Sequence, residues 1–144
     1  MKFMTKTLMA ATLLIAGAAF AAEPTDPNVI ARQDLMKTIG MNTKVLGDMA
    51  GGKAAYDAAK AAEAKAALIA AAADIGPKYE PITTDPAQET LPAVWTNWDD
   101  FVKKGEALTV AATAIDVSSA ETIGAGMGAI GGSCKDCHTT YRMK

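Results

Sequence analysis

The segment SSAETIGAGMGAIGGSCKDCHTTYR, residues 118–142, provides the pattern from which the fold of this chain is predicted. It opens with Ser118-Ser119-Ala120-Glu121, a capping box of the kind that starts helices. Larger apolar residues and both cysteines then recur at alternating spacings of four and three, which is typical of one helix face. These residues are Ile123, Met127, Ile130, Cys134, Cys137 and Tyr141. The segment therefore predicts a helix that carries both cysteines on its inner face.

The residues upstream predict three more helices. Asp26 can cap a first helix over residues 27–50, with Pro27 in its first turn and Gly51-Gly52 at its end. Alanine content predicts a second helix over residues 54–73, and a third runs from Pro92 to about residue 115. The expected inner faces are Val29, Arg32, Met36, Ile39, Thr43, Leu46 and Ala50 in the first, Tyr56, Ala59, Ala62, Ala66 and Ile69 in the second, and Val94, Trp98, Phe101, Gly105, Leu108, Ala112 and Ile115 in the third.

The remaining segments carry polar or helix-breaking residues. Residues 74–92 hold four prolines and predict an irregular connection without a further helix. Asp99, Asp100, Lys103 and Lys104 fall mainly off the inner face of the third helix and predict a solvated face.

Four helices without a strand signal make the expected fold class all-α, a four-helix bundle.

The N-terminus has the features of a secretory signal peptide. Lys2 and Lys6 precede an apolar run over residues 7–20, and Ala19-Phe20-Ala21 is a small-x-small cleavage site. The apolar run, of about 14 residues, is short of the roughly 20 that a membrane-spanning helix needs. We therefore expect residues 1–21 to be cleaved off, leaving residues 22–144 as one exported domain without a membrane anchor.

The charge balance disfavours nucleic acid and anionic membranes as partners. The formal net charge is −2 at pH 7, and loss of Lys2 and Lys6 leaves 12 basic against 16 acidic residues, a charge of −4. No basic tract interrupts this acidic balance.

Cys134-Lys135-Asp136-Cys137-His138 uses both cysteines and the single histidine of the chain. C-x-x-C-H is the attachment signature of c-type haem, in which two thiols add to the vinyl groups of the porphyrin and the imidazole ligates iron. A disulfide at this spacing would cross-link almost nothing. A redox C-x-x-C would be expected at a helix start after a strand, and zinc would lack a fourth Cys or His ligand. The sequence therefore predicts one covalent haem c, with His138 as the metal ligand.

The helical register places the chemistry-bearing side chains along one stripe. Cys134 and Cys137 lie one turn apart, His138 is four residues beyond Cys134, and Arg142 is four beyond His138. That arrangement suits two thioethers, an iron ligand and a propionate partner. A second histidine ligand is excluded within one chain, so the sixth iron position is either open or held by a methionine. Met36 is the mid-helix candidate on the first seam, and core packing is its other expected role.

The chain resembles cytochrome c′ and its low-spin relatives, the class II c-type cytochromes, over essentially all of its exported part. The residues that carry the resemblance are Arg32-Gln33 with Met36, Leu46-Gly47, Ala55-Tyr56-Asp57-Ala58-Ala59, Trp95 with Asp99-Asp100-Phe101, and Gly131 to His138 with Tyr141-Arg142. The resemblance implies a left-handed, antiparallel four-helix bundle, usually a homodimer, with haem near one end.

By position, the resemblance implies that Cys134 and Cys137 hold the haem and that His138 is its proximal ligand. Arg142 corresponds to the family arginine beside that ligand. Arg32 and Gln33 correspond to a pair near the propionates, and Glu89 to a polar position at the haem edge. Met36 takes the distal position. In cytochrome c′ the distal residue covers a five-coordinate iron that binds NO or CO, whereas in cytochrome c-556-like relatives a methionine there ligates the iron.

We expect a periplasmic carrier of single electrons that has an open iron position, exchanges electrons with redox partner proteins and binds NO or CO. A low-spin carrier with His138 and Met36 as ligands is the alternative. A peroxidase-type enzyme would need a distal acid–base residue, for which no histidine is left, so we expect no enzymatic activity. A haem-free structural or redox bundle is the third possibility.

Overall fold

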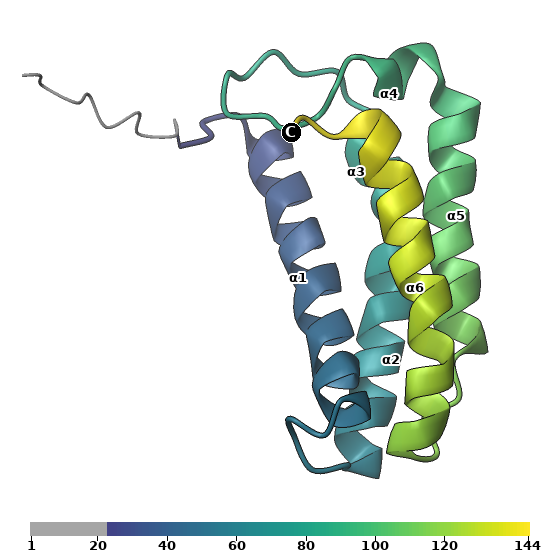
Figure 1. The fold of residues 1–144 in the computed structure, drawn as a ribbon. Coiled ribbons are helices and arrows are strands. Elements are labelled where there is room, and N and C mark those ends of the chain that lie inside the picture. The colour runs from purple at the N-terminus through teal and green to yellow at the C-terminus, as the bar shows by residue number, and fades with distance from the viewer. Residues whose placement is uncertain (1–22) are drawn as a thin grey trace, which may run out of the picture.

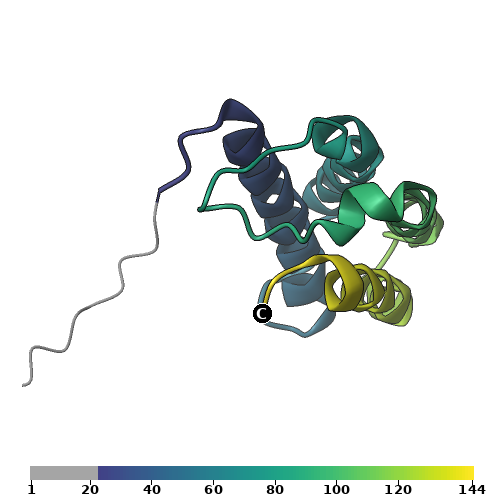
Figure 2. The same cartoon turned by 90° about the horizontal axis from the view of Figure 1, so that it is seen from above.

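Four long helices form a bundle in the computed structural model, which describes residues 23–144, and each runs antiparallel to the next long helix along the chain (Figure 1). They are α1 (Pro27–Ala50), α2 (Ala58–Ala73), α5 (Trp98–Ala114) and α6 (Ala120–Tyr141), and two short helices, α3 (Ile75–Tyr79) and α4 (Ala93–Thr96), lie between α2 and α5. Helices α1 and α5 each pack against both α2 and α6, so the four occupy the corners of a square in the view along the bundle (Figure 2). The expected all-α four-helix bundle is confirmed.

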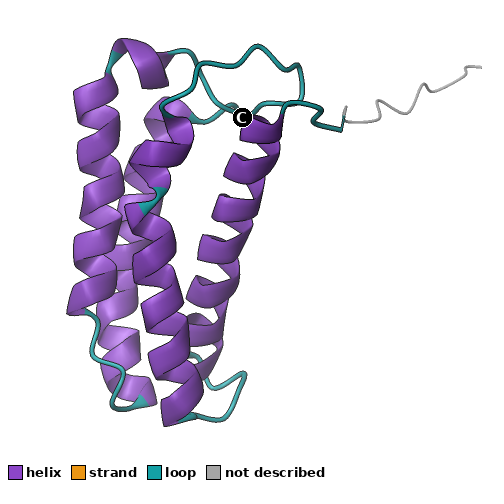
Figure 3. Cartoon of the chain, turned by 180° about the vertical axis from the view of Figure 1, so that it is seen from behind, coloured by secondary structure: helices purple, strands orange, loops and turns teal. Residues whose placement is uncertain are grey.

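Residues 23–144 contain no strand (Figure 3), and no helix among them is long and apolar enough to cross a membrane. The predicted signal peptide, residues 1–21, lies outside the described residues.

Helix α1 begins and ends as its sequence predicts. The Asp26 side chain accepts a hydrogen bond of 2.7 Å from the Asn28 amide, and Pro27 occupies the first turn. The helix ends at Ala50, and Gly52 follows with a φ of 70°, a backbone conformation that glycine adopts without strain. The predicted inner face is confirmed at Val29, Arg32, Ile39 and Leu46, which are all buried.

The prediction for α2 was wrong in its start and, except at Ile69, which packs against the core, in its inner face. The helix begins at Ala58 because the Asp57 side chain accepts from the Lys60 amide at 3.0 Å and acts as its N-cap. Its buried residues are Ala61, Ala64, Leu68, Ala71 and Ala72, whereas Ala59, Ala62 and Ala66 are exposed. Tyr56 lies before the helix, and its hydroxyl donates to the Val117 carbonyl at 2.8 Å. In a run of alanines the only large apolar residues are the adjacent Leu68 and Ile69, which do not single out one face by size.

The connection between α2 and α5 is more helical than predicted. Ile75–Tyr79 forms the short helix α3, although Gly76 and Pro77 suggested an irregular segment. The helix predicted from Pro92 is broken at Asn97, which has a φ of −124° and a ψ of 44° and separates α4 from α5. Residues 80–92, called the crossover below, pass over the end of the bundle that holds α3 and α4 (Figures 1 and 2).

Helix α6 starts one residue later than the capping box predicted. Ser119 is the N-cap and accepts from the Thr122 amide at 3.1 Å, while the Thr122 hydroxyl accepts from the Ser119 amide at 3.1 Å. Thr122 thus takes the place predicted for Glu121. The predicted seam is otherwise correct, because Ile123, Ile130 and Tyr141 are buried and both cysteines pack against the core.

The crossover is fastened to α1 at one end and to α6 at the other. The Asp85 carboxylate accepts hydrogen bonds from the amides of Thr25, Asp26 and Ala87 at 2.7 to 2.8 Å, and these bonds lower the pKa of that carboxyl to about 2. At the other end, Leu91 donates to the Tyr141 carbonyl at 2.9 Å and Met143 to the Glu89 carbonyl at 2.8 Å. The crossover therefore bridges α1 and α6 at one end of the bundle.

Candidate haem site

A cavity of about 490 Å³ lies inside the bundle beneath the crossover. This volume falls in the range of ligand-binding pockets. Its walls come from α1 on one side and α6 on the other, with α5, α3 and the crossover completing the enclosure. All eight residues predicted to hold or surround haem line this one cavity: Arg32, Gln33, Met36, Glu89, Cys134, Cys137, His138 and Arg142.

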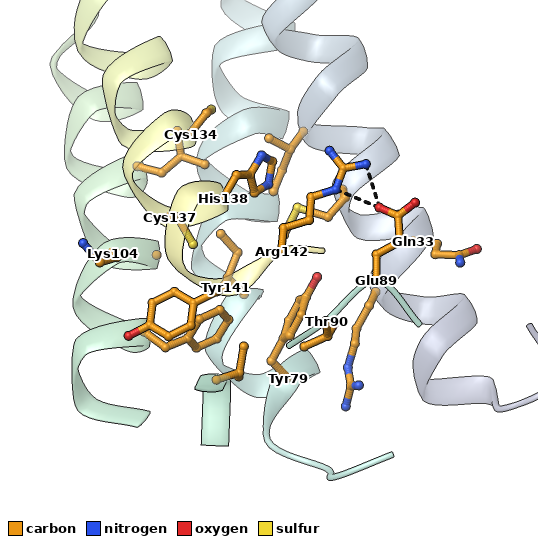
Figure 4. A pocket seen from close by; sticks show the side chains of 18 of the residues that line it. Gln33, Tyr79, Glu89, Thr90, Lys104, Cys134, Cys137, His138, Tyr141 and Arg142 are labelled. Carbon is orange, nitrogen blue, oxygen red and sulfur yellow. Dashed lines mark hydrogen bonds and ion pairs between the residues drawn. The ribbon is translucent and has the colours of Figure 1, made fainter. Parts of the chain in front are cut away.

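The α6 wall carries the attachment motif. Cys134, Cys137 and His138 project from adjacent turns toward the same space (Figure 4). Burial raises the pKa of the Cys134 thiol, and it raises the pKa of Cys137 to about 11 against the opposing effect of Lys104. Burial and then the Arg142 charge lower the pKa of His138. The imidazole is thereby favoured in its neutral form, which is the form that ligates metals.

Helix α1 supplies the wall opposite the motif. Met36, Ile39, Gly40 and Thr43 line it at helical spacing. Met36 is partly buried and packs against the hydrophobic core. It is the one sulfur-bearing residue of this wall. Between the polar pair Arg32 and Gln33 and the threonine at position 43, this wall is therefore apolar.

Arg32 is buried on α1, with 2% of its surface exposed. Its guanidinium donates to the Lys78 carbonyl at 2.9 Å, to the Thr83 hydroxyl at 2.9 Å and to the Pro81 carbonyl. The rings of Tyr79 and Trp95 flank the guanidinium, with centroids 5.1 and 5.5 Å from its central carbon. Burial lowers the pKa of this arginine. Arg32 thus lines the cavity and at the same time joins α1 to the segment that follows α3.

Glu89 and Arg142 form an exposed ion pair at the mouth of the cavity (Figure 4). Arg142 Nε and Nη2 lie 2.7 and 2.6 Å from the same Glu89 carboxylate oxygen. The Gln33 side chain, also at the mouth, donates weakly to the Ala87 carbonyl at 3.4 Å. Polar side chains thus gather at the crossover, where haem propionates could meet solvent.

The cavity lining includes residues that the sequence reasoning did not assign to the site, and Lys104 and Tyr79 are two of them. Lys104 was assigned to a solvated face, but its side chain is 19% exposed and lies in the cavity wall beside Cys137, paired with Asp136 of the motif and 4.0 Å from Asp100. Tyr79 came from a segment predicted to be irregular. A signal existed for Lys104, because a long side chain can cover apolar surface with its stem while its charge stays at the surface beside opposite charges of a neighbouring helix.

The donors in this cavity fit haem c. Two inward thiols one turn apart, an adjacent neutral imidazole and a deep apolar enclosure are the groups that covalent haem requires. Residues 23–144 contain no cluster of three or more His, Cys, Asp or Glu side chains that could hold a metal ion.

Comparisons with known proteins agree with this chemistry. The family model described as Cytochrome C′ matches residues 28–142. The chain is 35% identical to a cytochrome c-556 of Agrobacterium fabrum, over 96% of each chain. It is 31% identical to a cytochrome c′ of Cereibacter sphaeroides, over 98% of this chain and 99% of that one.

The solved structures give the same assignment. A nitric oxide complex of a variant of cytochrome c prime from Alcaligenes xylosoxidans superposes with a TM-score of 0.72. It is 25% identical and the match covers 81% of this chain and 94% of that one. The family match spans most of the chain and includes the whole attachment motif. This protein belongs to the cytochrome c′ family, whose members bind haem c.

Proposed function

We propose that this protein is a periplasmic electron carrier whose haem iron has His138 as its one protein ligand. When bound, haem c supplies a one-electron ferric–ferrous couple. The sixth iron position would be open toward α1 and able to bind NO or CO. The observation that carries this proposal is the cavity itself, which has His138 on one wall and, opposite it, an α1 wall whose only sulfur, Met36, packs against the core.

The proposed roles of the lining residues follow from their chemistry. Cys134 and Cys137 would form the thioethers, each by adding sulfur to one carbon of a vinyl group and hydrogen to the other. Neutral His138 would bind the iron. Arg142 and Arg32 would supply positive charge near the propionates, and Gln33 and Glu89 would complete the polar edge of the haem.

A low-spin carrier with Met36 as the sixth ligand is the second candidate. Two observations favour it. Met36 lines the α1 wall, and the cytochrome c-556 relative shares more identity with this chain than the cytochrome c′ relative does. A methionine ligand would also raise the reduction potential.

The proposed partners are periplasmic redox proteins, NO or CO, and a second copy of the chain. Ile30, Met41 and Val45 are exposed large apolar residues of α1, at 41%, 52% and 38%. Their spacing of 11 and 4 places them on one outward face of the helix, which is the proposed dimer contact. Sedimentation at micromolar concentration should give a dimer, and Met41→Glu should shift it toward monomer. A wild-type monomer would contradict the proposed dimer.

Carbon monoxide titration tests the proposed iron site. We expect the ferrous protein to bind CO readily and its absorption spectrum to be that of a high-spin haem before CO is added. Met36→Leu should leave the coordination unchanged, as should the control Met41→Leu on the exposed side of α1. A low-spin spectrum that becomes high-spin in Met36→Leu alone would replace the proposal with Met36 ligation.

A further inference from the structure

A second hollow, of about 560 Å³, opens on the outside of the bundle where α4, the start of α5 and the end of α6 meet. Its walls include the indoles of Trp95 and Trp98 and the carboxylates of Asp99 and Asp100, and Tyr141 closes it on the α6 side. No basic residue lines it, and it shares none of the residues at the mouth of the haem cavity. This outer hollow is therefore a concave surface with apolar walls and acidic charge.

Tyr141 lines both the outer hollow and the haem cavity. Its side chain is buried, and its hydroxyl points away from His138 (Figure 4) and donates to Asp100 Oδ2 at 2.5 Å. Cys137, which is proposed to hold the haem, lies one turn before Tyr141 on the same face of α6. One aromatic side chain therefore separates the outer hollow from the part of the cavity where Cys137 would hold the macrocycle.

The two aspartates give the outer hollow a negative charge. Asp99 takes part in none of the ion pairs among the described residues. Lys103 and Lys104, on the next turn of α5, do not line the outer hollow, and Lys104 bonds to Asp136. Acidic residues in a first turn also stabilise a helix, but the N-terminus carries only about half a positive elementary charge, which does not balance two carboxylates. A surface of this kind attracts cations.

A lysine or arginine side chain of another protein fits this lining. Its methylene stem can lie against the indoles of Trp95 and Trp98 while its charge meets Asp99 and Asp100. An inorganic cation would make no use of the apolar walls. Complementary charges also speed the encounter of two proteins, which suits the brief contact that a carrier of single electrons needs.

We propose that the outer hollow is a docking surface for a redox partner protein that inserts a lysine or arginine side chain, and that electrons reach the haem from the Tyr141 side. The inference rests on the proposed electron-carrier function, but on neither the spin state nor the sixth ligand of the iron. Helix α5 lies at the corner of the bundle diagonal to α1 (Figure 2), so the dimer contact proposed on α1 would leave this surface free.

Carbodiimide coupling of the oxidised holoprotein maps the docking surface. The probe is a tetralysine peptide that carries a ruthenium bipyridyl complex at its N-terminus, and its amines couple to carboxylates that they touch. At low ionic strength we expect mass spectrometry to find the peptide mainly on residues 99–100. Coupling mainly at Glu89, at the mouth of the haem cavity, would overturn the proposal.

Flash photolysis of the ruthenium complex measures electron transfer to the haem in the same complex. Asp99→Lys reverses an exposed charge and should weaken binding of the peptide about tenfold at low ionic strength. Glu121→Lys is the matched control, because it makes the same change at an exposed position about 30 Å from Tyr141 along α6, and it should leave binding near that of the wild type. Equal binding and equal rates in the two variants would overturn the proposal. So would binding of n-butylammonium as tight as that of the peptide, because it would mark a site for small cations.

Reduction by dithionite separates this inference from the proposed function. A haem that dithionite reduces, but that the bound peptide does not reduce after the flash, would leave the electron-carrier proposal standing and overturn the docking surface. A haem that dithionite fails to reduce would refute the electron carrier itself.

Discussion

Replacement of Arg32 by methionine should loosen the crossover and destabilise the whole protein. The guanidinium makes three hydrogen bonds to residues 78–83 and stacks between Tyr79 and Trp95. Methionine keeps a long apolar stem but supplies neither the charge nor the donors. The variant therefore removes the link between α1 and the segment after α3 without opening a large void.

The expected cost follows from these contacts. A hydrogen bond to a charged group contributes about 1.5–3 kcal/mol, so three would set an upper figure of roughly 5–9 kcal/mol. The net loss is smaller, because removing a buried charge recovers its desolvation penalty. The carbonyls of Lys78 and Pro81, which are exposed residues, can also turn to water. A net loss of about 2–4 kcal/mol remains, which corresponds to a fall in melting temperature of roughly 10 °C for a chain of this size.

Circular dichroism of the holoprotein during heating would measure this loss, and limited proteolysis would locate it. We expect faster cleavage of Arg32→Met within residues 78–90 than of the wild type. Lys37→Met is the matched control, because it removes a positive charge from an exposed position of the same helix. If Arg32→Met melts within 2 °C of that control and is cleaved no faster, Arg32 does not fasten the crossover.

Three further predictions concern packing, pH and cofactor attachment. Gly126→Ala should destabilise the protein, because the new Cβ would lie 2.6 Å from Ile115 Cγ1. At Gly128 a new Cβ meets open space, so Gly128→Ala should stabilise α6 by up to about 1 kcal/mol. Urea unfolding measures whether the two variants change the free energy of unfolding in opposite directions. Asp85 has its folded pKa lowered to about 2 from its usual value of about 4, so its contribution to stability is complete above about pH 4 and is lost as the pH falls toward 2. Asp85→Asn should remove that part of the acid transition, and an acid titration that is the same in both proteins would argue against it. Cys137→Ser should leave haem attached through one thioether, seen as a shifted pyridine haemochrome band with the haem mass retained; complete loss of covalent haem would show that one thiol is not enough.

The sequence was a reliable guide wherever large and small residues alternate. In α1 and α6 the bulky seam residues Val29, Leu46 and Ile130 left only one face that could be buried, and both helices bury it. The same reasoning placed Arg32 on an inward seam, although its charge argued for solvent. The structure explains that position through acceptors from residues 78–83, which no local pattern in α1 could reveal.

The errors come from segments where the deciding contact is far away in the sequence. Helix α2 is mostly alanine, so its buried face is chosen by the helices around it and not by its own pattern. Helix α3 forms despite Gly76 and Pro77 because Ile75 and Tyr79 are buried at its ends. Lys104 of α5 forms an ion pair with the exposed Asp136 of α6, which is 32 residues later.

The candidate site likewise has some features that follow from a local sequence pattern and others that depend on contacts distant in the sequence. The attachment motif indicates its own chemistry, so Cys134, Cys137 and His138 could be proposed as haem-binding residues from spacing alone, and the structure brings all three to one cavity. Thr43 was placed on the inner seam, but the lack of a partner for its hydroxyl is visible only in three dimensions. The ligand opposite His138 depends on how far Met36 reaches across the cavity, which its residue type does not determine.

Electron paramagnetic resonance of the ferric holoprotein tests the central proposal most directly, because it reports the ligand field of the iron. With His138 as the single protein ligand and the α1 side open, we predict a signal dominated by high-spin ferric iron, unchanged in Met36→Leu. A low-spin signal in the wild type that turns high-spin in Met36→Leu would contradict the open position and assign Met36 as the sixth ligand.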